Sequence, residues 1–446
     1  VAMSATLITF LSFFSDMGLS LALIAKDELN NVQKSNVFWL SGALGLMLFI
    51  ISFYLAPAVA DFYNSPLVKD IVRVQAISFI FIGANLQPIA LLKRNQNFAE
   101  VAKIDMVSAF LANAAGLALA FSGLGVWSIV VIPVLTHALR FPVYLKTQWG
   151  KLQRPQDIKN SLDILKFGGA LGAASILLYF ARNLDDVLIG RFLGASPLAF
   201  YSKAYFLVGA FTVLLNSAIS PVAISAMSKL RREGGSKDET LLLEKLRLMA
   251  FFVFPIATGV AAIAPDVILV VLGPQWLSSI FPLRVLALSG IGFTLMAAVG
   301  WSLVAHNKVR DYFKWTALTT LILCLGFWHF SQQHINAVSM FYSFAYGLIL
   351  PLPCFTWAMK KCGYKTVDKL VSLIPILFSA LFMGGFVYYC QYYVVTGLPL
   401  IVRLGINIPL GVFLYAVLAI KLVRPLPIPP LQRWLDRLSR RKDFED

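Results

Sequence analysis

The sequence predicts an all-α integral membrane protein with thirteen membrane spans. Of the 446 residues, 59% are hydrophobic and only 13% are charged, and the mean hydropathy is +0.76. Soluble domains carry about 25% charged residues, so a chain this apolar needs lipid as its solvent. Apolar runs of about 20 residues recur along the whole chain, which favours helices over a barrel, whose strands are about 10 residues long and alternate in polarity.

The spans follow one another with short polar loops between them, and each run is long enough to cross a bilayer. They are expected near residues 1–25, 37–60, 71–92, 104–122, 124–146, 163–193, 198–225, 246–272, 282–305, 313–330, 335–358, 370–393 and 399–420.

Lysine and arginine test this order of spans. Of the 38 lysine and arginine residues, 30 lie in seven alternate segments between or after the spans, and the six segments that separate these hold only five. Because positive loops stay in the cytoplasm, the chain is expected to start outside and end inside. This topology also explains the net charge of +16 without nucleic acid as a partner. Three cations then remain inside spans: Arg140, Arg182 and Lys203.

Two stretches 208 residues apart share their prolines. They read LAPAVADFYNSP at 55–66 and IAPDVILVVLGP at 263–274. Pro57 and Pro265 are expected to end long helices near the outer surface. Further matches pair SDMGLSLA with NSAISPVA and ALLKRNQ with SLVAHNK. Since the shift is six spans, the sequence predicts a parallel repeat about an axis along the membrane normal.

The repeat predicts how the chain is divided. The span near 163–193 has no partner in the first copy, and the outside start also lacks a preceding helix, so fourteen spans are expected in the natural chain. The expected parts are an N-terminal lobe (1–146) without its first helix, a cytoplasmic linker (147–162), a C-terminal lobe (163–358), an extra helix pair (359–421) and a basic cytoplasmic tail (422–446).

Charged side chains cluster in the sixth span, FGGALGAASILLYFARNLDDVLIGRFLG. Arg182 and Asp186 share a helix face and can pair, which would lock a helix pair or serve a substrate. Asn183 and Asp185 point elsewhere on the helix. A charge at the centre of a bilayer costs about 3 kcal/mol or more, so each needs a partner or a watery cavity.

Other charges near the spans are also candidates. Lys203 lies a span away from the nearest acids and is expected to be functional, whereas Asp16 occupies the matching outer half of the first copy. Arg140 beside Pro142 either snorkels or lines the inner mouth together with His137, one turn earlier.

Two charges are placed near the outer surface. Arg191 is expected to snorkel there, or to help line a cavity. Asp266, which follows Pro265, is expected to be a water-exposed helix cap.

No enzyme chemistry is visible in the sequence. It contains no GxxxxGK[ST] phosphate loop, its four histidines have no metal-ligand spacing, and no catalytic serine motif stands out. The four cysteines form no metal or redox pattern. The sequence therefore predicts no enzyme and no cofactor or metal. If the chain is a transporter, H⁺, Na⁺ or the gradient of its own substrate would drive it, and Asp16 and Asp185 are the candidates for ion coupling.

NLDDVLIGRFLGASPLAFYSKAYFLVG at 183–209 resembles the N-x-D-x-x-x-I-G-R-x-L-G-x-x-x-L-x-x-Y-S-x-A-Y pattern of polysaccharide-transport flippases. These form the Wzx-type branch of the multidrug/oligosaccharidyl-lipid/polysaccharide (MOP) exporter superfamily. Residues 10–28, 38–63 and 88–98 resemble the first lobe of the same family.

The resemblance implies two six-helix lobes around a central cavity that opens to each side in turn. The implied substrate is an undecaprenyl-pyrophosphate-linked oligosaccharide, moved across the inner membrane of a bacterium for export of an O-antigen or exopolysaccharide. Lys203, Arg182 and Arg140 would neutralise its diphosphate, because buried cations recognise phosphate oxygens. Membrane lipids, and polysaccharide polymerase machinery, are further partners that the resemblance allows.

Two other functions stay open at this point. A cation-coupled multidrug exporter of the same superfamily would favour an acidic, aromatic cavity, which the three intramembrane cations oppose. A membrane scaffold of a glycan assembly complex would transport nothing.

Overall fold

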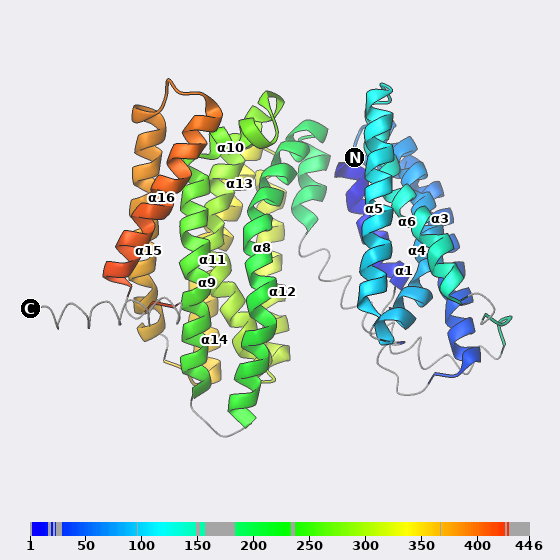
Figure 1. Ribbon diagram of the computed structural model, residues 1–446, viewed down its shortest axis with the longest axis horizontal. Coiled ribbons are helices and arrows are strands. Elements are labelled where there is room, and N and C mark those ends of the chain that lie inside the picture. The colour runs from blue at the N-terminus through cyan, green and yellow to red at the C-terminus, as the bar shows by residue number, and fades with distance from the viewer. Residues whose placement is uncertain are drawn as a thin grey trace, which may run out of the picture. The chain divides into compact units, whose positions relative to one another are not determined.

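The described part of the chain is built from helices. The computed structural model describes all residues except 1, 17–18, 21–22, 24–28, 96, 149–151, 157–182, 233–236, 366, 424–425 and 428–446. The chain divides into two units, Val1–Ala195 and Ser196–Asp446, and each unit is described by itself (Figure 1). All regular structure in the described residues is helical, which confirms the predicted all-α class.

Five long helices form in the described residues of the first unit. They are α1 (Ala2–Asp16), α3 (Asn31–Phe62), α4 (Pro66–Arg94), α5 (Phe98–Phe121) and α6 (Trp127–Gln148). A further helical stretch covers residues 183–192. Helix α3 packs against α4, and α6 packs against both α4 and α5.

Two glycines allow α3 and α4 to approach each other closely. A Cβ atom added to Gly45 of α3 would collide with the carbonyl oxygen of Phe79 in α4. A Cβ atom added to Gly83 of α4 would collide with the carbonyl oxygen of Ser41 in α3. The two backbones are therefore in contact at this crossing, as small residues permit in membrane helices.

The second unit is larger. Its α-helices are α8 (Ala195–Arg232), α9 (Lys237–Ala262), α10 (Ala264–Val271), α11 (Ile280–Ala305), α12 (Val309–Phe330), α13 (Ile335–Phe344), α14 (Pro351–Cys362), α15 (Val367–Tyr389) and α16 (Leu400–Leu422). A 3₁₀ turn, η2 (Pro274–Ser279), precedes α11. One π-helical turn, η3 (Ala345–Ile349), interrupts the span formed by α13 and α14, and another, η4 (Cys390–Val394), ends the span of α15.

One hydrophobic core joins most of these helices, including the last two. Trp301 of α11, Phe355 of α14 and Met249 of α9 are buried in it. The Thr258 hydroxyl of α9 donates to the Ala380 carbonyl of α15 at 2.9 Å. The Tyr415 hydroxyl of α16 donates to the Phe251 carbonyl of α9 at 2.9 Å. The extra helix pair is thus packed into the core of the second unit.

The number of apolar helices agrees with a protein that crosses the membrane many times. Among the described residues, nine helices are long and apolar enough to span a bilayer, or ten if α9 and α10 form one bent span. Helix α12 covers the span predicted near 313–330, and α1 covers the first part of the span predicted near 1–25. The span predicted near 163–193 lies largely outside the described residues.

The prolines of the predicted repeat have different local structures. Pro57 lies inside α3, so the prediction that it ends a helix is wrong. A proline removes one backbone hydrogen bond, and neighbouring helices can sustain the span through it. Pro265 begins α10 after an 81° bend, so the long helix does end there. Pro66 and Pro274 each occupy the start of a new helix.

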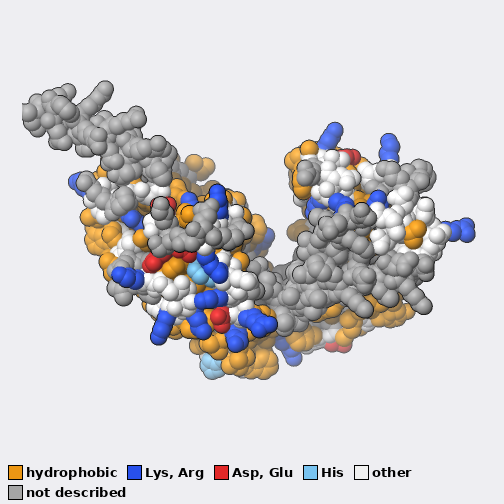
Figure 2. Space-filling model, turned by 90° about the horizontal axis from the view of Figure 1, so that it is seen from below, with side chains coloured by type: hydrophobic (Ala, Val, Ile, Leu, Met, Phe, Trp, Pro, Cys, Tyr) orange, Lys and Arg blue, Asp and Glu red, His pale blue; other side chains and the backbone are white. Residues whose placement is uncertain are grey.

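Basic loops of the second unit gather at one end. Arg231 Nη1 donates to the Ala305 carbonyl at 3.0 Å, and Lys308 Nζ contacts the carbonyl of Lys361. The ends of α8, α11 and α14 therefore meet, and Figure 2 shows lysine and arginine side chains over this end. This is the arrangement that the alternation of basic loops predicts. The predicted lobe boundaries stay a prediction, since the linker and the span after it lie largely outside the described residues.

Candidate functional site

Arg140 is held by an acid from the neighbouring helix. Its Nε lies 3.1 Å from Asp105 Oδ1, with side-chain exposures of 20% for Arg140 and 41% for Asp105. The Tyr144 hydroxyl, one turn further along α6, donates to the same oxygen at 3.1 Å. The sequence left Arg140 without a carboxylate, but α5 supplies one because it packs against α6. Arg140 is therefore a paired cation.

His137 lies one turn before Arg140, and its backbone contacts α4. The Asn85 side-chain amide donates to the His137 carbonyl at 3.0 Å. Helix α4 carries further polar side chains that sequence analysis did not single out. Gln75, Asn85 and Gln87 are buried, and the amide oxygen of each has no hydrogen-bond partner in the part of the chain that the structure describes. The sequence signal that could have found them is the presence of three amide side chains within an otherwise apolar run.

The charged segment at 183–192 is helical as expected. Asp185 is only 5% exposed, whereas Asn183 and Asp186 are half-buried. Arg191 is exposed, and its guanidinium carbon lies 5.5 Å from the centre of the Phe62 ring. With the Asn64 amide turned to satisfy both of its bonds, its oxygen accepts from Arg191 Nη1 at 3.1 Å. Arg191 thus sits at the end of α3 that topology places outside.

Lys203 differs from Arg140 in its surroundings. It is exposed on α8, and among the described residues it makes no hydrogen bond or ion pair. Stacked tyrosines flank this part of α8: the rings of Tyr201 and Tyr205 are 6.0 Å apart, and Tyr205 meets Tyr342 edge to face at 5.7 Å. A cation without a carboxylate remains available to an anionic ligand.

Two predicted site residues cannot be placed. Arg182 lies outside the described residues, so its expected pairing with Asp186 has no geometry. Asp16 is the last residue of α1, and only its backbone is described. Among the described residues, no three His, Cys, Asp or Glu side chains gather as metal ligands would.

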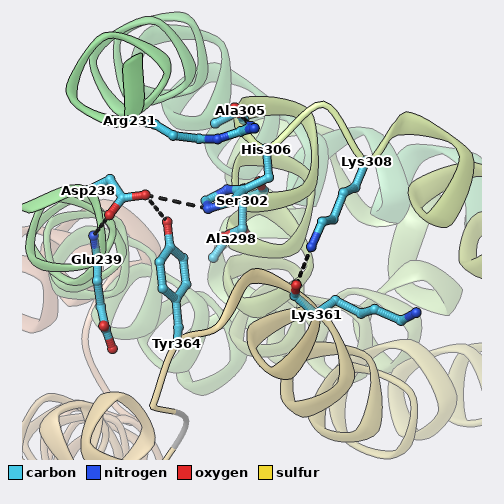
Figure 3. A network of polar contacts seen from close by, with 10 residues as sticks. All are labelled: Arg231, Asp238, Glu239, Ala298, Ser302, Ala305, His306, Lys308, Lys361 and Tyr364. Atoms are coloured by element: carbon cyan, nitrogen blue, oxygen red, sulfur yellow. Dashed lines mark hydrogen bonds and ion pairs between the residues drawn. The ribbon is translucent and has the colours of Figure 1, made fainter. Parts of the chain in front are cut away.

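A polar network closes the basic end of the second unit (Figure 3). Asp238, 6% exposed at the start of α9, accepts from the Tyr364 hydroxyl at 2.7 Å and from the Glu239 amide at 2.9 Å. His306 Nε2 lies 3.5 Å from the same carboxylate, and its Nδ1 lies 2.9 Å from the Ser302 carbonyl. The network ties α9, α11 and the loop after α14 together.

Burial dominates the titration of this network. It lowers the pKa of His306 below its ordinary 6.5, and although the Ser302 carbonyl and Asp238 act in the opposite direction, they do not outweigh it. Burial also raises the pKa of Tyr364, with Asp238 adding to the effect. Burial thus favours the neutral form of His306.

At the opposite end, Asp266 is not the water-exposed cap that its sequence position suggested. It is 1% exposed, and its Oδ1 lies 3.4 Å from Arg403 Nη2. The prediction failed because α10 bends away from α9 and packs against α16, which covers the carboxylate.

Comparison with known proteins gives a family and relatives. The family described as "Polysaccharide biosynthesis protein" matches residues 1–281. The teichuronic acid biosynthesis protein TuaB of Bacillus subtilis (strain 168) is 27% identical over 320 residues, which is 71% of this chain and 66% of that protein. The chain thus spans slightly less than two thirds of the length of TuaB.

A second relative is matched over more of its length. The "Probable low-salt glycan biosynthesis flippase Agl15" of Haloferax volcanii is 23% identical over 383 residues, or 78% of this chain and 79% of that protein. Among solved structures, "Lipid II flippase MurJ, inward closed conformation" has a TM-score of 0.72 at 15% identity and covers 95% of this chain and 92% of that one. This likeness confirms the two-lobe helical fold that the sequence resemblance predicted.

Proposed function

Because this chain belongs to the polysaccharide biosynthesis protein family, we propose that it is a flippase that moves a lipid-linked oligosaccharide across a membrane. The observation that carries the proposal is the long match to a relative named as a glycan biosynthesis flippase. The proposed substrate is linked to undecaprenyl pyrophosphate, and it passes from the cytoplasmic to the periplasmic leaflet of a bacterial inner membrane.

The diphosphate of such a substrate needs counter-charge at membrane depth, because an unpaired charge there is costly. Lys203 suits this task, since it is exposed and has no carboxylate partner among the described residues. Arg140 already has Asp105, so its proposed role is weaker than that of Lys203. Arg182, Arg191 and His137 complete the proposed set of cavity residues.

Transport would proceed by alternating access, as one lobe rocks against the other. The protein would act without a cofactor and without making or breaking covalent bonds. Protonation or Na⁺ binding at Asp16 and Asp185 is the proposed coupling. Polysaccharide polymerase machinery is the proposed partner that receives the product.

Replacing the cation at Lys203 tests this proposal. Lys203→Ala should abolish glycan export in cells while the protein reaches its normal level in the membrane, because the diphosphate loses its counter-charge. Lys203→Arg should keep most of the activity. The measurement is surface glycan by immunoblot, normalised to membrane-bound protein.

Lys314→Ala is the matched control, since Lys314 is an exposed lysine on α12 of the same unit. It should export like the wild type. Normal export by Lys203→Ala would remove Lys203 from the mechanism.

A further inference from the structure

The first unit contains a basic pocket at the end that topology places in the cytoplasm. Its volume is about 290 Å³, and it lies between the start of α3 and the end of α4. Lys34 and Arg94 line it, together with polar side chains that include Asn31 and Asn95, and no carboxylate lines it among the described residues. A pocket of this size can hold a small anionic group.

A segment that follows α6 forms one wall of the pocket. Leu152 lines it, and the residues that follow are fastened to α3. The Gln153 amide donates to Ser35 Oγ at 3.0 Å, and Trp39 Nε1 donates to the Gln153 carbonyl at 2.9 Å. The Gln156 amide and carbonyl both bond to the Asn36 side chain, at 3.0 and 2.6 Å. The wall is thus built by specific contacts.

The charges of the pocket converge from two helices. Lys34 is half-buried in the first turn of α3, where the helix dipole also favours an anion. Arg94 ends α4, and its Nη1 donates to the Leu23 carbonyl at 2.8 Å, which holds the guanidinium in place. Two cations with amide donors beside them are the groups that recognise phosphate oxygens.

The buried Gln87 side chain places a second requirement on the ligand of this pocket. Gln87 lines the pocket, its side chain is 1% exposed, and its amide oxygen has no hydrogen-bond partner in the described part of the chain. A buried acceptor without a donor is unfavourable, because it has lost its hydrogen bonds to water. A ligand that satisfies this pocket therefore presents negative oxygens to the cations and a hydroxyl donor to Gln87.

We propose that this pocket binds a sugar phosphate group, with Lys34 and Arg94 on the phosphate and Gln87 on a hydroxyl. Two sources would supply that chemistry: the glycosyl diphosphate of a polyprenyl-linked substrate, and a free sugar phosphate in the cytoplasm. The first source rests on the proposed function, whereas the site itself does not.

Binding of glucose 1-phosphate to the purified full-length protein in detergent tests the proposal by calorimetry. The wild type should bind it, and Lys34→Gln should weaken binding by about tenfold, the loss of one charge-assisted hydrogen bond. Lys103→Gln, which removes an exposed lysine on α5, should change binding less than twofold. An unchanged melting temperature would show that each variant is folded.

Gln87→Met separates recognition of the hydroxyl from recognition of the charge. It should weaken glucose 1-phosphate but leave sulfate binding unaltered, because sulfate carries no hydroxyl donor at neutral pH. Absence of glucose 1-phosphate binding to the wild type, or equal loss in the Lys34 and Lys103 variants, would overturn the proposal.

A competition experiment identifies which of the two sources supplies the sugar phosphate. Displacement of glucose 1-phosphate by undecaprenyl-diphosphate oligosaccharide supports the lipid-linked source, and displacement only by soluble sugar phosphates supports the free one. Binding without transport would refute the proposed function alone, and transport without binding would refute the pocket alone.

Discussion

At the scale of single residues, the structure gives Arg140 a partner that the sequence did not reveal. The sequence shows Arg140 as a cation within an apolar run, and the acid that pairs with it lies on a different helix. Asp105 could not be assigned from sequence because the pair depends on how α5 and α6 are aligned along each other. Lys203, in contrast, has no acid close to it in the sequence and pairs with none among the residues that the structure describes.

The Arg140–Asp105 pair should stabilise the packing of α5 on α6. Asp105→Ala and Arg140→Ala should each lower the apparent melting temperature in detergent, and the double variant should lose less than the sum of the two. The expected coupling is about 0.5–3 kcal/mol, as for residues in contact. Strictly additive losses would mean that the two charges do not interact.

His306 should make the second unit less stable in mild acid. Burial lowers its pKa in the folded protein, so below about pH 6.5 the unfolded chain takes up a proton that the folded one resists. Its stabilising contribution is therefore complete above that pH and lost as the pH falls further.

Melting temperatures measured from pH 7.5 to 5 check this behaviour of His306. His306→Gln should flatten the acid limb, whereas His329→Gln, at an exposed position, should not. A wild-type curve that stays flat over this range would contradict the assignment.

At the scale of helices, hydrophobic run length predicted most elements. The run at 282–305 became α11 (Ile280–Ala305), and the run at 104–122 became α5 (Phe98–Phe121). The run at 246–272 became two helices with an 81° bend, which run length alone does not predict. Pro57 and Pro265 show why: one lies inside a helix and the other begins one, so tertiary contacts decide between the two outcomes.

The crossing of α3 and α4 should tolerate no side chain at its centre. Gly45→Ala places a Cβ against the Phe79 carbonyl and should separate the helices, at a cost of about 1–3 kcal/mol. The loss would appear as a lower apparent melting temperature. Gly42→Ala, on the same helix but with open space around it, should match the wild type or exceed it. Equal behaviour of both variants would show that the close contact does not matter.

At the scale of the whole molecule, composition predicted the all-α membrane class, and the alternation of basic loops predicted that they gather at one end. The basic loops of the second unit meet at one end, as alternation requires. The docking of α15 and α16 was not predictable, because it depends on side-chain contacts such as those of Thr258 and Tyr415 with distant backbone. The pocket at Lys34 and Arg94 was equally hidden, since its residues come from three separate segments.

Transbilayer movement of the proposed substrate tests the central claim most directly. The purified protein would be reconstituted into vesicles with a fluorescent undecaprenyl-diphosphate oligosaccharide in both leaflets, and a membrane-impermeant quencher would be added outside. The account predicts that quenching proceeds beyond the outer half, faster than in protein-free vesicles. Quenching that stops at the outer leaflet, as it does without protein, would contradict it and leave a scaffold or a drug exporter instead.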